Sequence, residues 1–113
     1  MADFYLVEQG RGPAWDHSKR RREQAGWDEH AAFMDAHTDE GVVVLGGPLG
    51  GDDGENVLLV VDVESEAAIR ARLAEDPWAN GMLTIESVKP WSVWLRANKA
   101  SATATTTVPE PTP

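Results

Sequence analysis

The sequence predicts an α+β fold with the element order β-α-β-β-α-β, a ferredoxin-like arrangement in which a four-stranded antiparallel sheet carries both helices on one face. Three observations support this prediction. The chain of 113 residues fits one domain. Short apolar runs rich in valine, leucine and aromatic residues are bounded by glycine and proline. Two segments with helical periodicity separate those runs in a two-fold β-α-β pattern.

The first apolar run is Phe4–Val7, and it ends at the turn residues Gly10–Pro13. A helix is predicted from about Glu23 to Asp39, closed by Gly41, because apolar and histidine side chains recur there at helical spacing. The residues on that side of the helix are Trp27, His30, Ala31, Met34 and His37.

The middle of the chain predicts a β-hairpin. Val42–Leu45 is a strand that is expected to stop at Gly46–Pro48, and Val57–Val61 is the next strand. The glycine-rich segment Gly50–Gly54 lies between them and predicts a broad turn.

A second helix and the last main strand follow the hairpin. Ser65 is expected to cap a helix that runs through Glu75. Pro77 disfavours helical geometry at Asp76, so the helix should end there, with Asp76 near its apolar side. Met82–Val88 then predicts the last main strand.

The end of the chain differs in composition from the rest. After the last main strand, Ser92–Leu95 has the pattern of a second short β-like piece. Residues 97–113 are small, polar and proline-rich, which predicts a disordered tail. The folded domain is therefore expected to span residues 2–96.

The composition excludes several classes of function. The net charge of −9 is unfavourable for binding nucleic acid. The absence of cysteine rules out disulfides, thiol nucleophiles and thiolate metal sites. No apolar run approaches the roughly 20 residues of a membrane helix, and the N-terminus lacks the features of a signal peptide. The expectation is a soluble, cytoplasmic protein that makes no contact with membranes.

The two middle strands point beyond a single chain. Val42–Leu45 and Val57–Val61 are apolar at every position, whereas a sheet with helices on one side alone should alternate. No further helix is predicted that would cover the second face, so the sheet of a second copy is expected to cover it. The sequence thus predicts a homodimer packed sheet to sheet.

His30 and Asp76 are the candidates for acid–base chemistry. His30 lies in the middle of the apolar side of its helix, where an imidazole can act as a general base or acid in a pocket between helix and sheet. The alternative is a core histidine that is hydrogen-bonded to the backbone. Asp76 can orient that imidazole, or it can cap a short helical turn with Pro77 at its first position. These two roles of Asp76 are compatible.

Other features permit both a structural and a functional interpretation. The basic cluster Lys19–Arg22 is either a solvated patch or a rim that attracts anions. Trp27, Trp78 and Trp91 fall beside the proposed pocket elements, either as core residues or as the lining of a cavity for a planar ligand. Gly46–Pro48 lacks the spacing of a phosphate-binding loop, and its glycines allow the backbone to approach a pocket closely.

A metal site is not predicted. His17 lies in a loop, and His30 and His37 are two turns apart on the helix, too far to share one ion without bending it. We therefore expect neither a metal nor another cofactor.

Four motifs, in this order, resemble the YCII-related family over roughly Phe4–Leu95. They are His30 ahead of Phe33-Met34, the segment Gly41–Leu49, Asp76-Pro77-Trp78, and Pro90-Trp91. The resemblance implies a dimeric α+β barrel and a pair formed by His30 and Asp76 in a pocket beside the sheet. It also implies small aromatic or enol-forming substrates, because at least one member of the family is a cofactor-free dehydrochlorinase that acts on a chlorinated hydroxyquinol. The long loop Gly10–Arg22 departs from the family pattern and is a candidate cover for the pocket or part of the dimer interface.

Taken with the resemblance, the residues predict a small cofactor-independent enzyme that binds a small-molecule ligand. His30 would move a proton on an enolisable or phenolic substrate, and Asp76 would orient His30. Trp78 and Trp91 would shape the pocket, and the backbone at Gly47 or Pro48 would line it. Two alternatives from other classes remain open: a dimer that binds a small ligand without turnover, and a regulatory module.

Overall fold

The computed structural model describes residues 2–97, and its elements follow the predicted α+β order. They are β1 (Phe4–Arg11), η1 (Arg21–Glu23), α1 (Trp27–Asp39), β2 (Val43–Pro48), β3 (Val57–Val61), α2 (Glu66–Leu73), η2 (Pro77–Asn80) and β4 (Leu83–Trp91), where η denotes a short 3₁₀ helix. The four strands form one antiparallel sheet in the order β2-β3-β1-β4. The ferredoxin-like prediction is therefore confirmed, and the tail predicted for 97–113 lies, from residue 98 on, outside the described residues.

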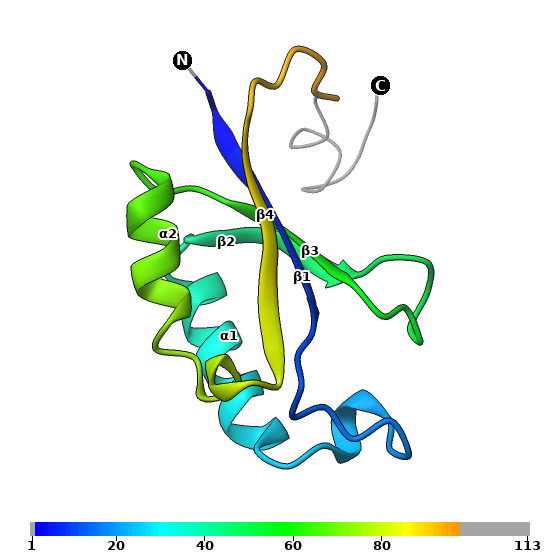
Figure 1. The fold of residues 1–113 in the computed structure, drawn as a ribbon. Helices are drawn as coiled ribbons and strands as arrows, with labels where there is room; N and C mark the ends of the chain where they lie inside the picture. The colour runs from blue at the N-terminus through cyan, green and yellow to red at the C-terminus, as the bar shows by residue number, and fades with distance from the viewer. Residues whose placement is uncertain (1, 98–113) are drawn as a thin grey trace, which may run out of the picture.

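Both helices lie on the same side of the sheet (Figure 1). The core between helices and sheet contains six buried apolar residues from β1, β2, β3 and α2. These are Val7, Val43, Leu59, Val61, Ile69 and Leu73. A second, smaller core joins Trp15 and Trp78 to Met82 and Leu83 at the start of β4. The second core lies beside the candidate site described below and holds the long loop against it.

The first helix begins later than the sequence predicts. It starts at Trp27 rather than at Glu23, because Gly26 has a φ of 79° in the left-handed region and interrupts the helical backbone. Ahead of this break, Arg21–Glu23 forms the separate turn η1. The consequence is a sharp change of direction that places η1 and its arginines beside the N-terminal end of α1.

Strand β2 does not stop at the glycines as predicted. Gly46, Gly47 and Pro48 continue the strand and pair with Leu59, Leu58 and Val57 in turn. A proline is tolerated there because β2 is an edge strand, where the missing N–H leaves no neighbour without a donor.

The predicted strand at Ser92–Leu95 is absent, and β4 instead continues without a break to Trp91. Trp91 pairs with Phe4, the first residue of β1. Beyond that pair β1 offers no further strand residue, so the chain that follows has nothing to pair with as a strand. The backbone N–H of Val93 donates instead to the Asp3 carboxylate, at 2.7 Å.

The two capping predictions agree with the structure. Ser65 caps α2, since its hydroxyl accepts a hydrogen bond from the N–H of Ala68 at 3.1 Å. Asp76 caps η2, with Pro77 at the first position of that turn. The second cap also determines where the carboxylate of Asp76 points.

The face of the sheet opposite the helices carries apolar side chains. Directly paired residues of antiparallel strands share a face, and Val60 pairs with both Leu6 and Leu45. Leu45 is 68% exposed and Val60 is 8% exposed within the protomer. The continuous apolar runs therefore do supply side chains to both faces.

No helix among residues 2–97 has the length and apolar character needed to cross a bilayer.

Candidate active site

Asp76 is held in place by the local chain. It follows α2, and its extended backbone (φ −63°, ψ 131°) makes it the N-cap of η2. Its Oδ1 accepts a hydrogen bond from the N–H of Trp78 at 2.9 Å. The residue is 5% exposed, so its carboxylate is taken out of water and fixed by the turn that it caps.

His30 meets this carboxylate from the first turns of α1. Its Nδ1 lies 2.9 Å from Oδ1 and 2.8 Å from Oδ2 of Asp76. A carboxylate accepts hydrogen bonds, so Nδ1 must carry the proton and donate it. No residue in the described part of the chain hydrogen-bonds to Nε2, which is left as the imidazole nitrogen that a ligand can use. The two residues that the sequence singled out are thus brought into one buried pair.

An aromatic cluster supports the imidazole. The ring of Trp78 stacks on that of His30, and the indole Nε1 of Trp78 donates to the carbonyl oxygen of Ala25 at 2.9 Å. Trp27 and Trp15 each lie with their ring centroids 5.6 Å from that of Trp78. His30 is therefore held by a hydrogen bond at one edge and by an indole face, which restricts its rotation.

His30 faces a cavity of about 630 Å³ between α1, the turn η1 and strands β2 and β3. We call it the His30 cavity. Gly47 and Pro48 line it, as do Gly46 and the mostly apolar residues Trp27, Met34, Val43 and Leu59. Arg21 and Arg22 line the cavity at its η1 end. A volume of this size is within the range of small-molecule sites.

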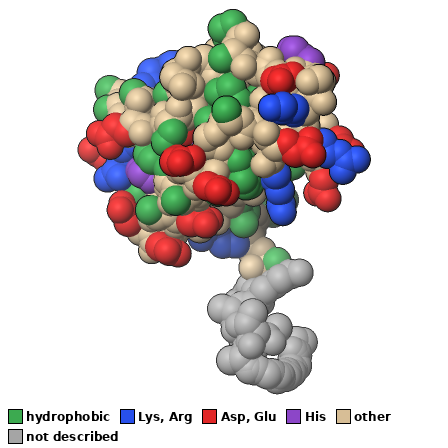
Figure 2. All heavy atoms as spheres, turned by 90° about the horizontal axis from the view of Figure 1, so that it is seen from below, with side chains coloured by type: hydrophobic (Ala, Val, Ile, Leu, Met, Phe, Trp, Pro, Cys, Tyr) green, Lys and Arg blue, Asp and Glu red, His purple; other side chains and the backbone are tan. Residues whose placement is uncertain are grey.

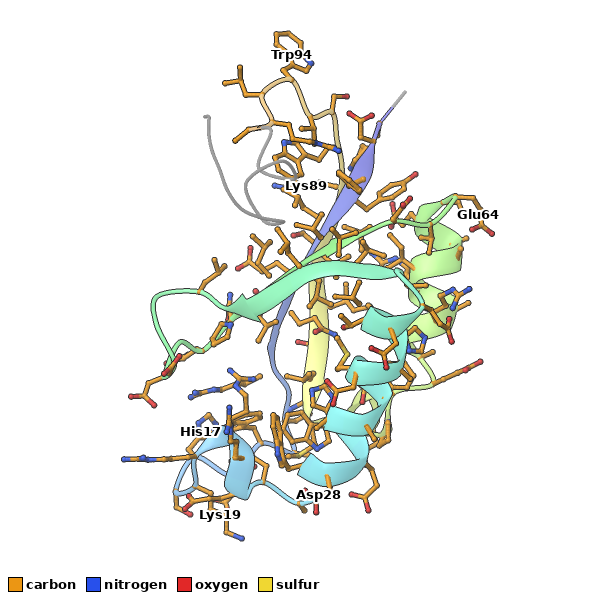
Figure 3. The ribbon with its side chains drawn as sticks, turned by 180° about the vertical axis from the view of Figure 1, so that it is seen from behind. His17, Lys19, Asp28, Glu64, Lys89 and Trp94 are labelled. Atoms are coloured by element: carbon orange, nitrogen blue, oxygen red, sulfur yellow. The ribbon has the colours of Figure 1, made fainter. Side chains whose placement is uncertain are left out.

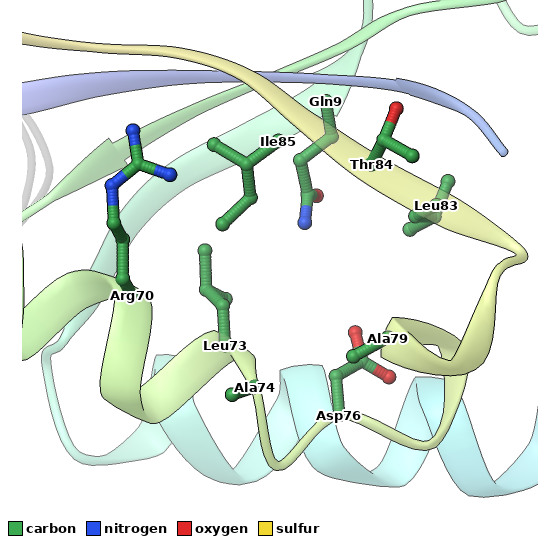
Figure 4. A pocket seen from close by; sticks show the side chains of 9 residues that line it. All are labelled: Gln9, Arg70, Leu73, Ala74, Asp76, Ala79, Leu83, Thr84 and Ile85. Atoms are coloured by element: carbon green, nitrogen blue, oxygen red, sulfur yellow. The ribbon is translucent and has the colours of Figure 1, made fainter.

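A second cavity, of about 360 Å³, touches the other member of the pair. Figure 4 shows Asp76 pointing into it from the connection after α2, and Gln9 from β1 on the opposite side. Gln9 and Leu83 line both cavities. The His30–Asp76 pair therefore lies between two hollows, with the imidazole toward the larger one and the carboxylate toward the smaller.

Two of the sequence-predicted pocket residues do not line the His30 cavity. Trp78 is 1% exposed and packs behind His30 instead. Trp91 is 41% exposed and pairs with Phe4. Its neighbours in the sequence, Lys89 and Trp94, lie in Figure 3 at the end of the molecule away from His17, Lys19 and Asp28.

The structure also adds residues that the sequence did not single out. Gln9 is 5% exposed and occupies an inward position of β1, two residues after Val7. A polar residue at an inward position of a strand indicates a candidate functional residue, because burial of an amide that has no hydrogen-bond partner costs free energy. Gly46 pairs with Leu59 on the helix-facing side, so the lack of a side chain there leaves room in the cavity.

The charge of Arg21 is the electrostatic feature of the cavity. Burial, and after it the like charge of Arg11, lower the pKa of the Arg21 guanidinium below its ordinary value. An arginine nevertheless remains protonated in a protein.

No group of three His, Asp or Glu side chains in residues 2–97 is arranged to hold a metal ion.

Comparison with known proteins places the chain in one family. The model of the YCII-related domain matches residues 6–92, which include every strand and both helices in whole or large part. Proteins of that family have a dimeric α+β barrel fold. No curated protein and no solved structure matches the chain. Because the domain model covers most of the sequence, this protein belongs to the YCII-related family.

Proposed function

We propose that this protein is a small cofactor-independent enzyme in which His30 and Asp76 transfer a proton on a small aromatic or enolisable substrate. One observation carries the proposal. The carboxylate of Asp76 occupies Nδ1 of His30, at 2.8 Å, and leaves Nε2 as the imidazole nitrogen beside a cavity of about 630 Å³. A positioned imidazole with one nitrogen fixed and the other facing a ligand is the arrangement that general acid–base catalysis requires.

The proposed step is a single proton transfer. Nε2 accepts a proton from a carbon next to a carbonyl, or from a phenolic hydroxyl, and the electron pair stays on the substrate as an enolate or phenolate. The carboxylate of Asp76 stabilises the imidazolium that this creates. The enolate is then either reprotonated by His30 at another atom, which is an isomerisation, or it expels a leaving group such as chloride, which is an elimination.

The surroundings of His30 suit a small, largely apolar substrate. The cavity presents aromatic and aliphatic side chains, together with the backbone of Gly46–Pro48. A site that excludes water strengthens the electrostatic interaction between the imidazolium and a developing oxyanion. Trp78 acts from behind, by keeping the imidazole in one orientation.

We further propose that the protein acts as a homodimer through the helix-free face of its sheet. Proteins of this family are typically dimeric. On that face Leu45 is 68% exposed and Leu6 is half-buried in the protomer, while Val60 between them is already buried. Pairing with a second sheet would remove this surface from water.

The second candidate function is a homodimer that binds a small ligand without turnover, or a regulatory module. This candidate is favoured by the structural role of Asp76, which caps η2 in addition to bonding to His30. A buried pair with that role can be retained for the fold alone. A measurement of turnover distinguishes the enzyme from the non-catalytic protein.

The test is proton abstraction itself. Small enolisable ketones and keto acids, such as phenylacetone and phenylpyruvate, are incubated with the protein in D₂O, and deuterium incorporation next to the carbonyl is followed by ¹H NMR. We expect the wild type to accelerate incorporation for at least one probe and His30→Asn to abolish the acceleration. An asparagine amide can still donate to Asp76 in place of Nδ1, but it has no counterpart of Nε2.

The matched control is His37→Asn. His37 lies on the same helix, and its Nδ1 bonds to the carbonyl oxygen of Phe33 at 3.0 Å, away from the residues that line the cavity. We expect this variant to keep the wild-type exchange rate. Saturable binding of the probes by a wild type that accelerates none of them would favour the non-catalytic alternative.

A further inference from the structure

The arginines at the η1 end of the His30 cavity are not used by the proton transfer described above. Arg21 and Arg22 line the same cavity as His30. They also line a neighbouring pocket of about 560 Å³ near Pro48. The two guanidinium groups therefore stand where the loop before α1 meets the end of β2.

Neither of these guanidinium groups forms an ion pair with a carboxylate of residues 2–97. The side-chain ion pairs among residues 2–97 are His30–Asp76, Arg70–Glu66 and Arg72–Glu40. The Arg21 side chain makes one hydrogen bond within the described residues, from Nη2 to the carbonyl oxygen of Gly54 at 2.9 Å, and its buried Nε has no acceptor among them. A protein with 19 acidic and 10 basic residues has ample carboxylates with which to pair these arginines, yet no carboxylate of residues 2–97 does so.

A second half-buried arginine, Arg11, increases the local positive charge. The buried Nε of Arg11 also lacks an acceptor. The guanidinium carbons of Arg11 and Arg21 lie 4.8 and 5.3 Å from the centroid of the Trp15 ring. Two cations held against one indole repel each other, and an anion bound beside them would relieve that repulsion as well as satisfy the unused donors.

The opposing charge near these arginines is limited. Of the residues that line the His30 cavity, Asp35 alone has a carboxylate other than that of the pair, and it lies exposed on α1. Asp52, Asp53 and Glu23 line the neighbouring pocket but do not reach Arg21 or Arg22 within ion-pair distance. On the face of the molecule that Figure 2 shows, Lys and Arg side chains lie among Asp and Glu side chains, so the face shown is no continuous basic surface of the kind that binds nucleic acid.

We propose that the ligand of the His30 cavity carries an anionic group, a carboxylate or a phosphate, and that Arg21 and Arg22 hold this group while the rest of the ligand reaches toward His30. Guanidinium groups present a planar fork of donors that matches both anions. The apolar lining of the cavity accommodates the rest of the ligand. The inference deepens the proposed function, and it rests on that proposal only in taking the His30 cavity as the ligand site.

The test compares matched probes that differ in charge. Benzoate and benzamide have the same ring and nearly the same shape, and phenyl phosphate carries the other anion. Binding to the full chain is measured through tryptophan fluorescence and through the NMR signals of the indole N–H groups, because Trp15 and Trp27 lie beside the arginines. We expect at least one of the two anions to bind at least about tenfold more tightly than benzamide. The tighter of the two anions identifies the chemistry. This preference should weaken as salt is added.

Variants assign the preference to residues. Arg21→Gln and Arg22→Gln should each reduce anion binding several-fold, and the double variant should remove the preference over benzamide. Arg21→Lys retains the charge and should retain part of the affinity. Arg72→Gln is the matched control, because it removes an exposed arginine that pairs with Glu40 outside the cavity. If Arg21→Gln does not fold, the exposed Arg22 still tests the proposal.

Three outcomes would overturn the inference: equal affinity for the anions and benzamide, a preference that survives in the double variant, or no saturable binding of any anion. These outcomes are distinct from a failure of the proposed function. Anion preference without deuterium exchange would leave the arginine site in place and remove the enzyme. Exchange with neutral ketones at full rate and no anion preference would do the reverse.

Discussion

The imidazole of His30 lies flat against the indole of Trp78, with ring centroids 4.1 Å apart and ring planes 7° apart. The same tryptophan donates its backbone N–H to Asp76, the residue that holds Nδ1 of His30. The three side chains therefore position one another, although α1 supplies the first and the η2 turn supplies the other two. Removal of any one of these side chains should therefore change the position of the other two.

The first prediction concerns the carboxylate of this trio. Asp76→Ala leaves the buried Nδ1–H of His30 and the N–H of Trp78 without an acceptor, so we expect a loss of about 2–3 kcal/mol in the free energy of unfolding. Asp76→Asn keeps an oxygen for the cap and should lose only about 1 kcal/mol. Urea unfolding measures both. Asp28→Asn, in the exposed first turn of α1, is the control, and we expect a change within about 0.5 kcal/mol. Equal stability of Asp76→Ala and wild type would contradict this description of the pair.

The second prediction uses two adjacent glycines of β2. A Cβ at Gly46 would lie 2.7 Å from Cδ2 of Leu59, which is 2% exposed, whereas a Cβ at Gly47 would meet nothing within 4 Å. We expect Gly46→Ala to destabilise the protein by about 1–3 kcal/mol and to narrow the His30 cavity. Gly47→Ala should be neutral or slightly stabilising, by up to about 1 kcal/mol. Thermal melts of the two variants side by side measure the difference, and equal melting temperatures would show that β2 is not placed as described.

The sequence predicts the pair better than it predicts the rest of the cavity, for a physical reason. His30 lies on a regular helix, and Asp76 caps the turn that begins at Pro77, so periodicity and capping place each residue on its own element. That the two residues meet is what the family resemblance implied. The ends of the strands depend on pairing: β2 continues through Gly46–Pro48 because β3 is there to bond with it. The identity of the turn residues Gly46–Pro48 does not indicate whether a neighbouring strand is there to pair with them.

The arginine end of the cavity depends on an irregular loop that no periodicity describes. Its course follows from the left-handed Gly26 and from the buried side chain of Gln24. The sequence offered the basic cluster Lys19–Arg22 as either a solvated patch or an anion-attracting rim. The structure separates its members, since Arg21 and Arg22 line the His30 cavity and Lys19 does not.

The third prediction tests the proposed dimer. Leu45 is exposed on the helix-free face, so Leu45→Lys should leave the protomer folded and shift the protein from dimer to monomer. Ala36→Lys is the control, because Ala36 is exposed on α1, on the other side of the sheet. Light scattering after size exclusion gives the mass, and circular dichroism checks the fold. A wild type that is monomeric at micromolar concentration would refute the dimer.

The last prediction concerns Gln24, which holds the long loop in shape. This side chain is 3% exposed. Its Nε2 donates to the carbonyl oxygens of Asp16 at 2.7 Å and of Lys19 at 3.0 Å, and its Oε1 accepts from the N–H of Asp16 at 3.0 Å. One amide thus satisfies three backbone groups of the segment that leads to Arg21.

Gln24→Ala leaves those backbone groups without their partner, at a cost of about 2 kcal/mol or more if they stay buried. We expect the segment between Asp16 and Gln24 to open instead, because the second core and the backbone bonds of Gly12 and Ala14 hold only the start of the loop. Amide exchange should then rise over residues 16–24 while the sheet stays protected. Gln24→Glu keeps the acceptor and loses the donors, and it should have an intermediate effect. If Arg21 and Arg22 select anionic ligands, Gln24→Ala should also reduce benzoate binding toward that of benzamide, although it removes no charge. Hydrogen exchange by mass spectrometry and the same binding titration measure the two effects, and a protected loop in Gln24→Ala would show that other contacts hold the arginines in place.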